Sequence, residues 1–152
     1  MKILILLLFC LFSGQTWAQS KNTATEVKDY REVDGKIILD LAVNGEMASF
    51  VLDLSGHTAL LPEFLEKLKI DPEVSGNFRY DHFLYKDVPT SKTVSVNTMA
   101  FGNNVFGNAV PAFILEDEPY LRQLGVVGIV GGALFRNVVL TIDSKRKKIT
   151  TS

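Results

Sequence analysis

Apolar and polar residues alternate with a period of two over much of the chain after residue 35. The alternation is clear over residues 36–43 and again over residues 46–52, and an Asn44-Gly45 pair separates the two runs. A period of two is typical of a β-strand with one buried face. Asn-Gly favours a tight hairpin turn, because both central positions of that turn need a positive φ. The pattern therefore predicts an antiparallel hairpin over residues 36–52.

Further short runs of the same kind predict a mostly β domain. A helix is expected only over residues 62–69, where Pro62 suits the first turn and Phe64, Leu65 and Leu68 share one face. Single helical turns are expected at 120–124 and 133–135, and no order is predicted for 73–92. Strands are expected at 93–101, 105–115, 126–130, 138–143 and 148–151. Many closely spaced strands with one or two short helices predict an all-β fold, a small closed barrel.

The first 18 residues differ from the rest of the chain. Lys2 is followed by an almost unbroken apolar run over residues 3–12, and small residues precede a cut after Ala18. This order predicts a cleavable signal peptide, and a membrane anchor is the alternative, although the run is shorter than the roughly 20 apolar residues a span needs. Residues 19–34 are polar and are expected to be a flexible leader or an extended N-terminal arm. The domain is then expected to cover residues 35–152.

Composition limits the classes of partner. Lys and Arg total 16 and Asp and Glu total 17, and the one basic run covers residues 145–148. Nucleic-acid binding is therefore not expected, because that function needs a basic stripe or an arginine cluster. Signal cleavage would remove Cys10, the only cysteine, and leave no apolar segment long enough to cross a membrane. A secreted or periplasmic protein without cofactor or bound metal is expected.

Asp53 is the candidate catalytic residue. It ends the apolar strand Phe50-Val51-Leu52 and enters a loop of Leu54, Ser55 and Gly56. A carboxylate at a strand end beside small residues can face a cleft. The alternative is a structural role, in which the Asp side chain caps the turn by accepting backbone N–H groups.

The order of these features resembles the retropepsin-like aspartic protease family in its single-lobe bacterial form. The Asn-Gly hairpin leads into Asp53 and a Pro-initiated helix, and a later apolar-apolar-Gly segment, Ile129-Val130-Gly131, precedes a helical turn and a closing hairpin. The resemblance covers most of residues 35–152 and implies a barrel of the pepsin and retropepsin type. It also implies Asp53 as the catalytic aspartate, with Ile129, Val130 and Gly131 as the supporting loop.

Two functions follow from the resemblance. The first is a peptidase that acts on polypeptide substrates as a homodimer, with paired Asp53 carboxylates and an activated water. The second is an inactive peptide-binding module of the cell envelope, because Leu54 and Ser55 stand where the family has Thr or Ser and then Gly. Leucine lacks the hydroxyl that links the two loops, and serine carries a Cβ that glycine lacks.

Other chemistries have weaker support. His57 and His82 with Asp53 match no metal-ligand spacing, and a Ser55–His57 pair lacks an orienting third group. The glycines at 125, 128 and 131 do not have dinucleotide-binding spacing, so they are expected to form a close-packed loop. A wide β-barrel carrier of an apolar ligand would need more long strands than this chain offers.

Overall fold

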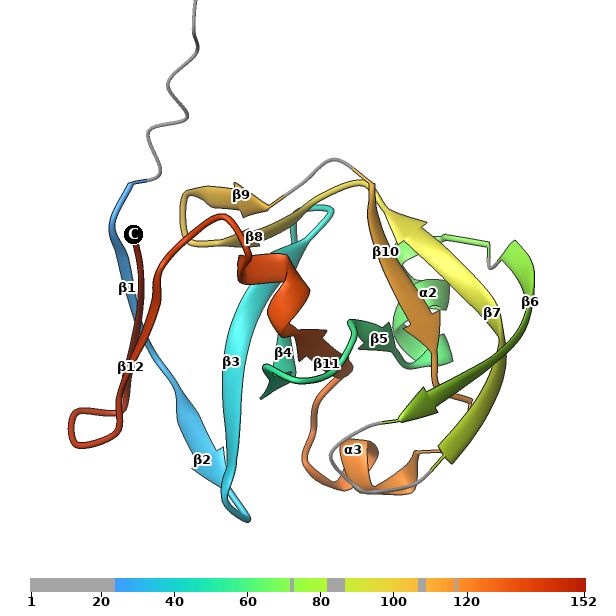
Figure 1. Ribbon diagram of the computed structural model, residues 1–152, viewed down its shortest axis with the longest axis horizontal. Coiled ribbons are helices and arrows are strands. Elements are labelled where there is room, and N and C mark those ends of the chain that lie inside the picture. Colours follow the sequence, from blue (N-terminus) through green and yellow to red (C-terminus); the bar gives the residue numbers. More distant parts are fainter. Residues whose placement is uncertain (1–23, 72, 82–86, 107–108, 117) are drawn as a thin grey trace, which may run out of the picture.

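The computed structural model describes residues 24–71, 73–81, 87–106, 109–116 and 118–152, and nearly all of its regular structure is β (Figure 1). A small antiparallel sheet has the order β1 (Glu26–Asp29), β13 (Lys148–Thr151), β12 (Leu140–Asp143). A ten-stranded sheet curls into a half barrel beside it. No helix in the described part of the chain is long and apolar enough to cross a membrane.

The large sheet brings distant parts of the chain together. Its order is β6 (Glu73–Asp81), β7 (Asp87–Val96), β10 (Val110–Ile114), β5 (Ala59–Leu60), β11 (Gly128–Gly131), β4 (Glu46–Asp53), β3 (Lys36–Val43), β8 (Met99–Phe101), β9 (Asn104–Phe106), with β2 (Arg31–Val33) also paired to β3. Only the β4–β11 and β5–β10 pairs are parallel. The helical segments are α2 (Pro62–Leu68), α3 (Pro119–Gln123) and the 3₁₀ helix η1 (Gly132–Phe135).

The predicted hairpin and helix are both confirmed. Strands β3 and β4 pair antiparallel around Asn44 and Gly45, whose φ angles of 50° and 87° are the positive values that this turn requires. In α2, Pro62 occupies the first turn and Phe64 is buried, with its ring 6.2 Å from that of Phe50 in an edge-to-face arrangement. The helix ends at Lys69, which adopts the left-handed conformation.

The centre of the large sheet is buried on both faces. Phe50 on β4 and Val130 on β11 enter the larger of two hydrophobic clusters. Their chain neighbours Val51 and Ile129 enter the smaller cluster on the other face. Because successive strand residues point to opposite faces, consecutive apolar residues are required where both faces are covered. This double burial positions the ends of β4 and β11, where Asp53 and Gly131 lie.

From Glu26 onward, residues 19–34 form the extended arm of the two alternatives, and the expectation of a flexible leader is wrong there. Strand β1 pairs with β13 and strand β2 pairs with β3, and Tyr30 between them is buried. The backbone N–H of Tyr30 donates to the carbonyl of Lys147 at 3.0 Å. Polar residues can form such strands because pairing uses backbone groups, so a missing apolar period did not indicate a missing strand.

Two strands expected to be continuous are each divided. The 93–101 run divides between β7 and β8, and the 105–115 run divides between β9 and β10. Strand β7 pairs with β6 and β10, whereas β8 pairs with β3 and β9. At the first break the apolar positions shift by one residue, from Val94 and Val96 to Met99 and Phe101, but the sequence does not say with which strand each half pairs. The resulting β6–β7 hairpin covers most of 73–92, for which no order was predicted.

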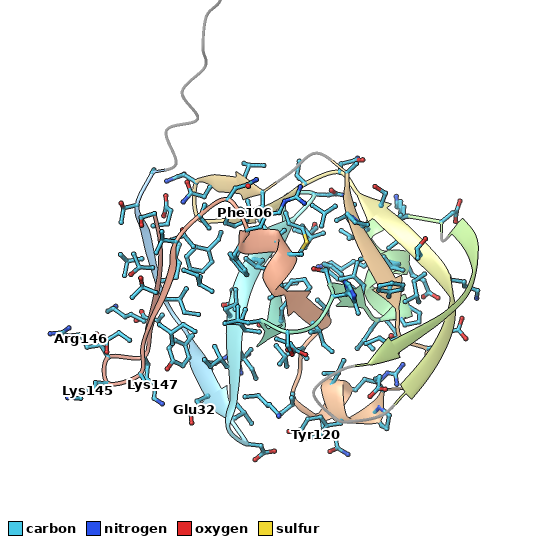
Figure 2. The ribbon with its side chains drawn as sticks, viewed as in Figure 1. Glu32, Phe106, Tyr120, Lys145, Arg146 and Lys147 are labelled. Carbon is cyan, nitrogen blue, oxygen red and sulfur yellow. The ribbon has the colours of Figure 1, made fainter. Side chains whose placement is uncertain are left out.

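The short helical turns and the closing hairpin are found close to their predicted positions, as α3, η1 and the pair β12–β13. Asp143 Oδ1 accepts the backbone N–H groups of Lys145 and Arg146 at 3.1 and 3.0 Å, which organises the basic turn. These hydrogen bonds, that of Arg146 first, lower the pKa of Asp143. Lys147 in the same turn pairs with Glu32 of β2 and so ties the turn to the large sheet (Figure 2).

Candidate active site

Asp53 is the last residue of β4, and its side chain is only 8% exposed. Its Oδ1 atom accepts three hydrogen bonds from the loop that follows: from Ser55 N at 3.1 Å, Ser55 Oγ at 2.8 Å and Gly56 N at 3.2 Å. An aspartate that accepts backbone N–H groups two and three residues ahead closes an Asx-type turn. The carboxylate therefore caps the turn, which is the structural role considered for it, and one of its two oxygens is sufficient for this role.

The second carboxylate oxygen of Asp53 differs from the first in its hydrogen bonding. Oδ2 is buried and has no hydrogen-bond partner among the described residues. A buried acceptor without a donor costs about 1–3 kcal/mol, so native structures keep few of them. Since Oδ1 alone completes the turn, the unsatisfied Oδ2 indicates an atom available for an interaction outside this loop.

Strand β11 brings the predicted supporting loop beside the aspartate. It runs parallel to β4, with Ile129 opposite Val51, Val130 opposite Leu52, and Gly131 opposite Asp53. The Gly131 N–H donates to the hydroxyl of Thr58 at 3.2 Å, and Thr58 is itself buried. Thr58 was not predicted as a site residue, since nothing in its local sequence distinguishes it from an ordinary strand threonine.

Two consecutive glycines, the last residue of β11 and the first of η1, are needed for close backbone approach. A Cβ at Gly131 would lie 2.7 Å from the carbonyl carbon of His57, and closer still to the carbonyl oxygen of Gly56. A Cβ at Gly132 would lie 3.1 Å from the carbonyl carbon of Leu54 and closer to its oxygen. Gly131 has an ordinary φ of −83°, so space alone explains its presence. The Asp53 loop, residues 53–58, is thus packed directly on the β11–η1 backbone.

Leu54 projects from this loop and is 55% exposed. It follows the buried Asp53 directly, so an apolar side chain stands on the surface next to the candidate catalytic group. Ser55 differs, because its hydroxyl turns back to the carboxylate. The proton of that hydroxyl is directed at Asp53, which disfavours the Ser55–His57 pair considered for acyl transfer.

His57 follows in the same loop, with its ring 5.6 Å from that of Phe113 in an edge-to-face contact. His82, the other histidine considered as a metal ligand, lies outside the described residues. Within the described residues, no group of three His, Cys, Asp or Glu side chains is placed to hold a metal ion. The expectation of close packing is confirmed at Gly128, which packs against the carbonyl of Ala59, but it is wrong at Gly125, where an added Cβ would meet nothing within 4 Å.

A pocket of about 870 Å³ lies beside the Asp53 loop. Its lining includes His57 and Thr58, and otherwise comes mainly from β9, β10, η1 and the residues after η1. Asp53 does not line it. The carboxylate and this pocket are therefore separate features that share one short stretch of chain.

Comparison with solved structures identifies the fold. The chain is similar to the crystal structure of a retropepsin-like aspartic protease from Rickettsia conorii, with a TM-score of 0.58 and 18% sequence identity over 84% of this chain and 92% of that chain. No protein-family model and no curated protein matches the sequence. The curled sheet, the parallel β4–β11 pair and this similarity show that the chain has a retropepsin-like all-β fold, as the resemblance implied.

Proposed function

We propose that the chain is one subunit of an exported aspartic peptidase that acts as a homodimer. The observation that carries this proposal is the Asp53 carboxylate, which has one oxygen saturated by its own loop and the other buried without a donor. A second copy of Asp53 would supply what Oδ2 lacks. Two carboxylates about 3 Å apart cannot both ionise, so they share a proton, and that proton would be the missing donor.

The chemistry follows from this shared proton. The ionised carboxylate takes a proton from a water molecule, whose oxygen attacks the carbonyl carbon of the scissile peptide bond. The protonated carboxyl donates its proton to the carbonyl oxygen, which gives a neutral tetrahedral intermediate. Collapse of this intermediate breaks the C–N bond, and a carboxyl returns a proton to the leaving nitrogen. The β6–β7 hairpin, at one end of the large sheet, would be the flap that covers the substrate.

Export is the second part of the proposal. Its support is the order of Lys2, the apolar residues 3–12 and the small residues before Ala18. The mature protein is then expected to start near Gln19 and to be secreted or periplasmic. Sequencing the N-terminus of the exported protein tests this, and a protein that retains Met1 in the cytoplasmic fraction would contradict it.

Substitution of Asp53 tests the catalytic part. Asp53→Asn should abolish cleavage of a mixed peptide library, because an amide cannot replace the carboxylate as a base. Wild-type activity should be highest at acidic pH, where one carboxyl of the pair stays protonated. Asp143→Asn is the matched control, since that carboxylate also closes a turn but lies in the distant basic hairpin. Activity that survives Asp53→Asn would overturn the proposal.

An inactive peptide-binding module is the second candidate, and the exposed Leu54 favours it. A leucine beside the carboxylate cannot make the hydroxyl links between loops that the resemblance implies, although it could contact an extended peptide added to a sheet edge. The double substitution Leu54→Thr and Ser55→Gly separates the two candidates. A gain of cleavage supports a peptidase with a weakened loop, whereas a folded and inactive double variant supports the binding module.

A further inference from the structure

The pocket beside the Asp53 loop has the properties of a small-molecule site. Its volume of about 870 Å³ lies within the range of roughly 300–1,000 Å³ that is usual for such sites. Its lining comes mainly from β9, β10, η1 and the residues that follow η1. We call it the Arg136 pocket, after the one lining residue that carries a permanent charge.

The walls of the Arg136 pocket are largely apolar. Phe106 on β9, Phe113 on β10 and Leu134 on η1 contribute large side chains to its lining. Phe106 is labelled in Figure 2. Its ring packs edge to face on that of Phe135 at 5.2 Å, which holds this wall against η1. Fixed apolar walls with a few polar groups are typical of pockets that are formed before the ligand arrives.

The only permanent side-chain charge in the described lining of the pocket is positive. Among the described residues, no aspartate or glutamate lines the pocket, although the chain has 17 acidic residues. Arg136 is exposed and has neither a hydrogen-bond nor an ion-pair partner within the described part of the chain. Its guanidinium group can therefore bind a ligand without first breaking a bond to the protein.

The two asparagines on the β9 side are already engaged. Asn103 donates to Glu26 Oε1 from its backbone N–H at 3.0 Å and from its side chain at 2.7 Å. The side chain of Asn104 donates to Ala24 O at 2.6 Å and to the Thr151 hydroxyl at 3.0 Å. These bonds hold the β9 rim against the small sheet. Arg136 is then the charged donor of the lining, and the exposed Asn137 beside it is a neutral one.

We propose that the Arg136 pocket binds a small monocarboxylate with an apolar body. The carboxylate would pair with Arg136, whose planar guanidinium group matches a carboxylate in two parallel hydrogen bonds. The apolar body would lie against Phe106 and Leu134. This site is independent of the proposed peptidase function, because Asp53 does not line the pocket.

Calorimetric titration with hydrocinnamate, a carboxylate with a phenyl body, tests the proposal on the full chain. Its neutral amide, hydrocinnamamide, is the matched ligand control. The carboxylate should bind about tenfold more tightly than the amide, since hydrogen bonds to charged groups are roughly twice as strong as neutral ones. Equal affinity for the two compounds, or no heat from either, would overturn the proposal.

Amino-acid substitutions test whether hydrocinnamate binds in the Arg136 pocket. Arg136→Gln should lower hydrocinnamate affinity about tenfold, to that of the amide. Lys145→Gln removes an exposed charge in the basic turn, away from the pocket lining, and should change nothing. Ala133→Phe fills the pocket from an exposed position, so it should abolish binding while the urea midpoint stays near that of the wild type. Binding that survives both pocket substitutions would contradict the assignment.

Asp53→Asn separates this site from the proposed active site. Hydrocinnamate affinity should not change, because the ligand carboxylate would not lie near Asp53. A marked gain in affinity would mean that the anion binds beside the former carboxylate, which would refute the Arg136 pocket as its site. Loss of peptide cleavage in the same variant would leave the pocket assignment intact.

Discussion

The Asp53 loop and the Arg136 pocket share His57 and Thr58, but their charged groups differ in burial and in hydrogen bonding. Asp53 is buried, and one of its oxygens accepts three hydrogen bonds from its own loop. Arg136 is exposed and has no partner within the described residues. The loop rests on backbone packed against β11, whereas the pocket is bounded by side chains. The difference implies that substitutions in the loop should affect folding and substitutions in the pocket should affect binding.

Gly131→Ala should have the largest effect. The new Cβ would clash with backbone atoms of Gly56 and His57, which cannot move without displacing the whole loop. Overpacking of this kind costs about 3 kcal/mol of unfolding free energy. Urea unfolding measures the loss. Gly125→Ala is the control, because that glycine has a φ of 68° with open space around it. Gly125→Ala should cost only about 1 kcal/mol, from backbone strain. Equal losses of unfolding free energy in the two variants would contradict the packing argument.

Thr58→Val should have the next largest effect. The substitution keeps the shape of the side chain and removes the hydroxyl that accepts the Gly131 N–H. A buried N–H without an acceptor costs about 1–3 kcal/mol, so a loss near 2 kcal/mol is expected from urea unfolding. Thr58→Ser retains the hydroxyl and should restore protection of the Gly131 amide in hydrogen exchange. Unchanged exchange in Thr58→Val would show that β4 pairing alone holds this strand end.

Ser55→Ala should cost about 1 kcal/mol, because Asp53 Oδ1 keeps its two backbone donors and loses only the hydroxyl. Ser144→Ala in the exposed basic turn serves as the control, and its free energy of unfolding should stay within about 0.5 kcal/mol of the wild-type value. Denaturant unfolding of both variants provides the comparison. An equally small effect at Ser55 would mean that the backbone donors alone orient the carboxylate.

Arg136→Gln should have the smallest effect on stability, within about 0.5 kcal/mol, because an exposed side chain without a partner is being replaced. Its effect should instead appear in hydrocinnamate affinity. A large loss in thermal or urea stability would show that Arg136 supports the fold, and the contrast between loop and pocket would then not hold.

Local pattern was sufficient for much of the fold. Alternation and the Asn44-Gly45 pair predicted the first hairpin, and Pro62 with its spaced apolar residues predicted α2, because both depend on contacts within a few residues. Consecutive apolar residues at Val51-Leu52 and Ile129-Val130 fitted strands buried on both faces. The placement of Asp53 at a strand end before small residues was likewise visible, and it made this carboxylate the candidate.

Tertiary structure alone decided the rest. The apolar positions shift by one residue between β7 and β8, but this shift does not say that β7 pairs with β10 and β8 pairs with β3. The strand character of β1 depends on β13, which lies more than a hundred residues away along the chain. The unsatisfied Oδ2, the role of Thr58 and the pocket at Arg136 arise where the Asp53 loop meets β11 and η1. Such groups depend on which distant backbones pack together, and a single sequence carries no local signal for that choice.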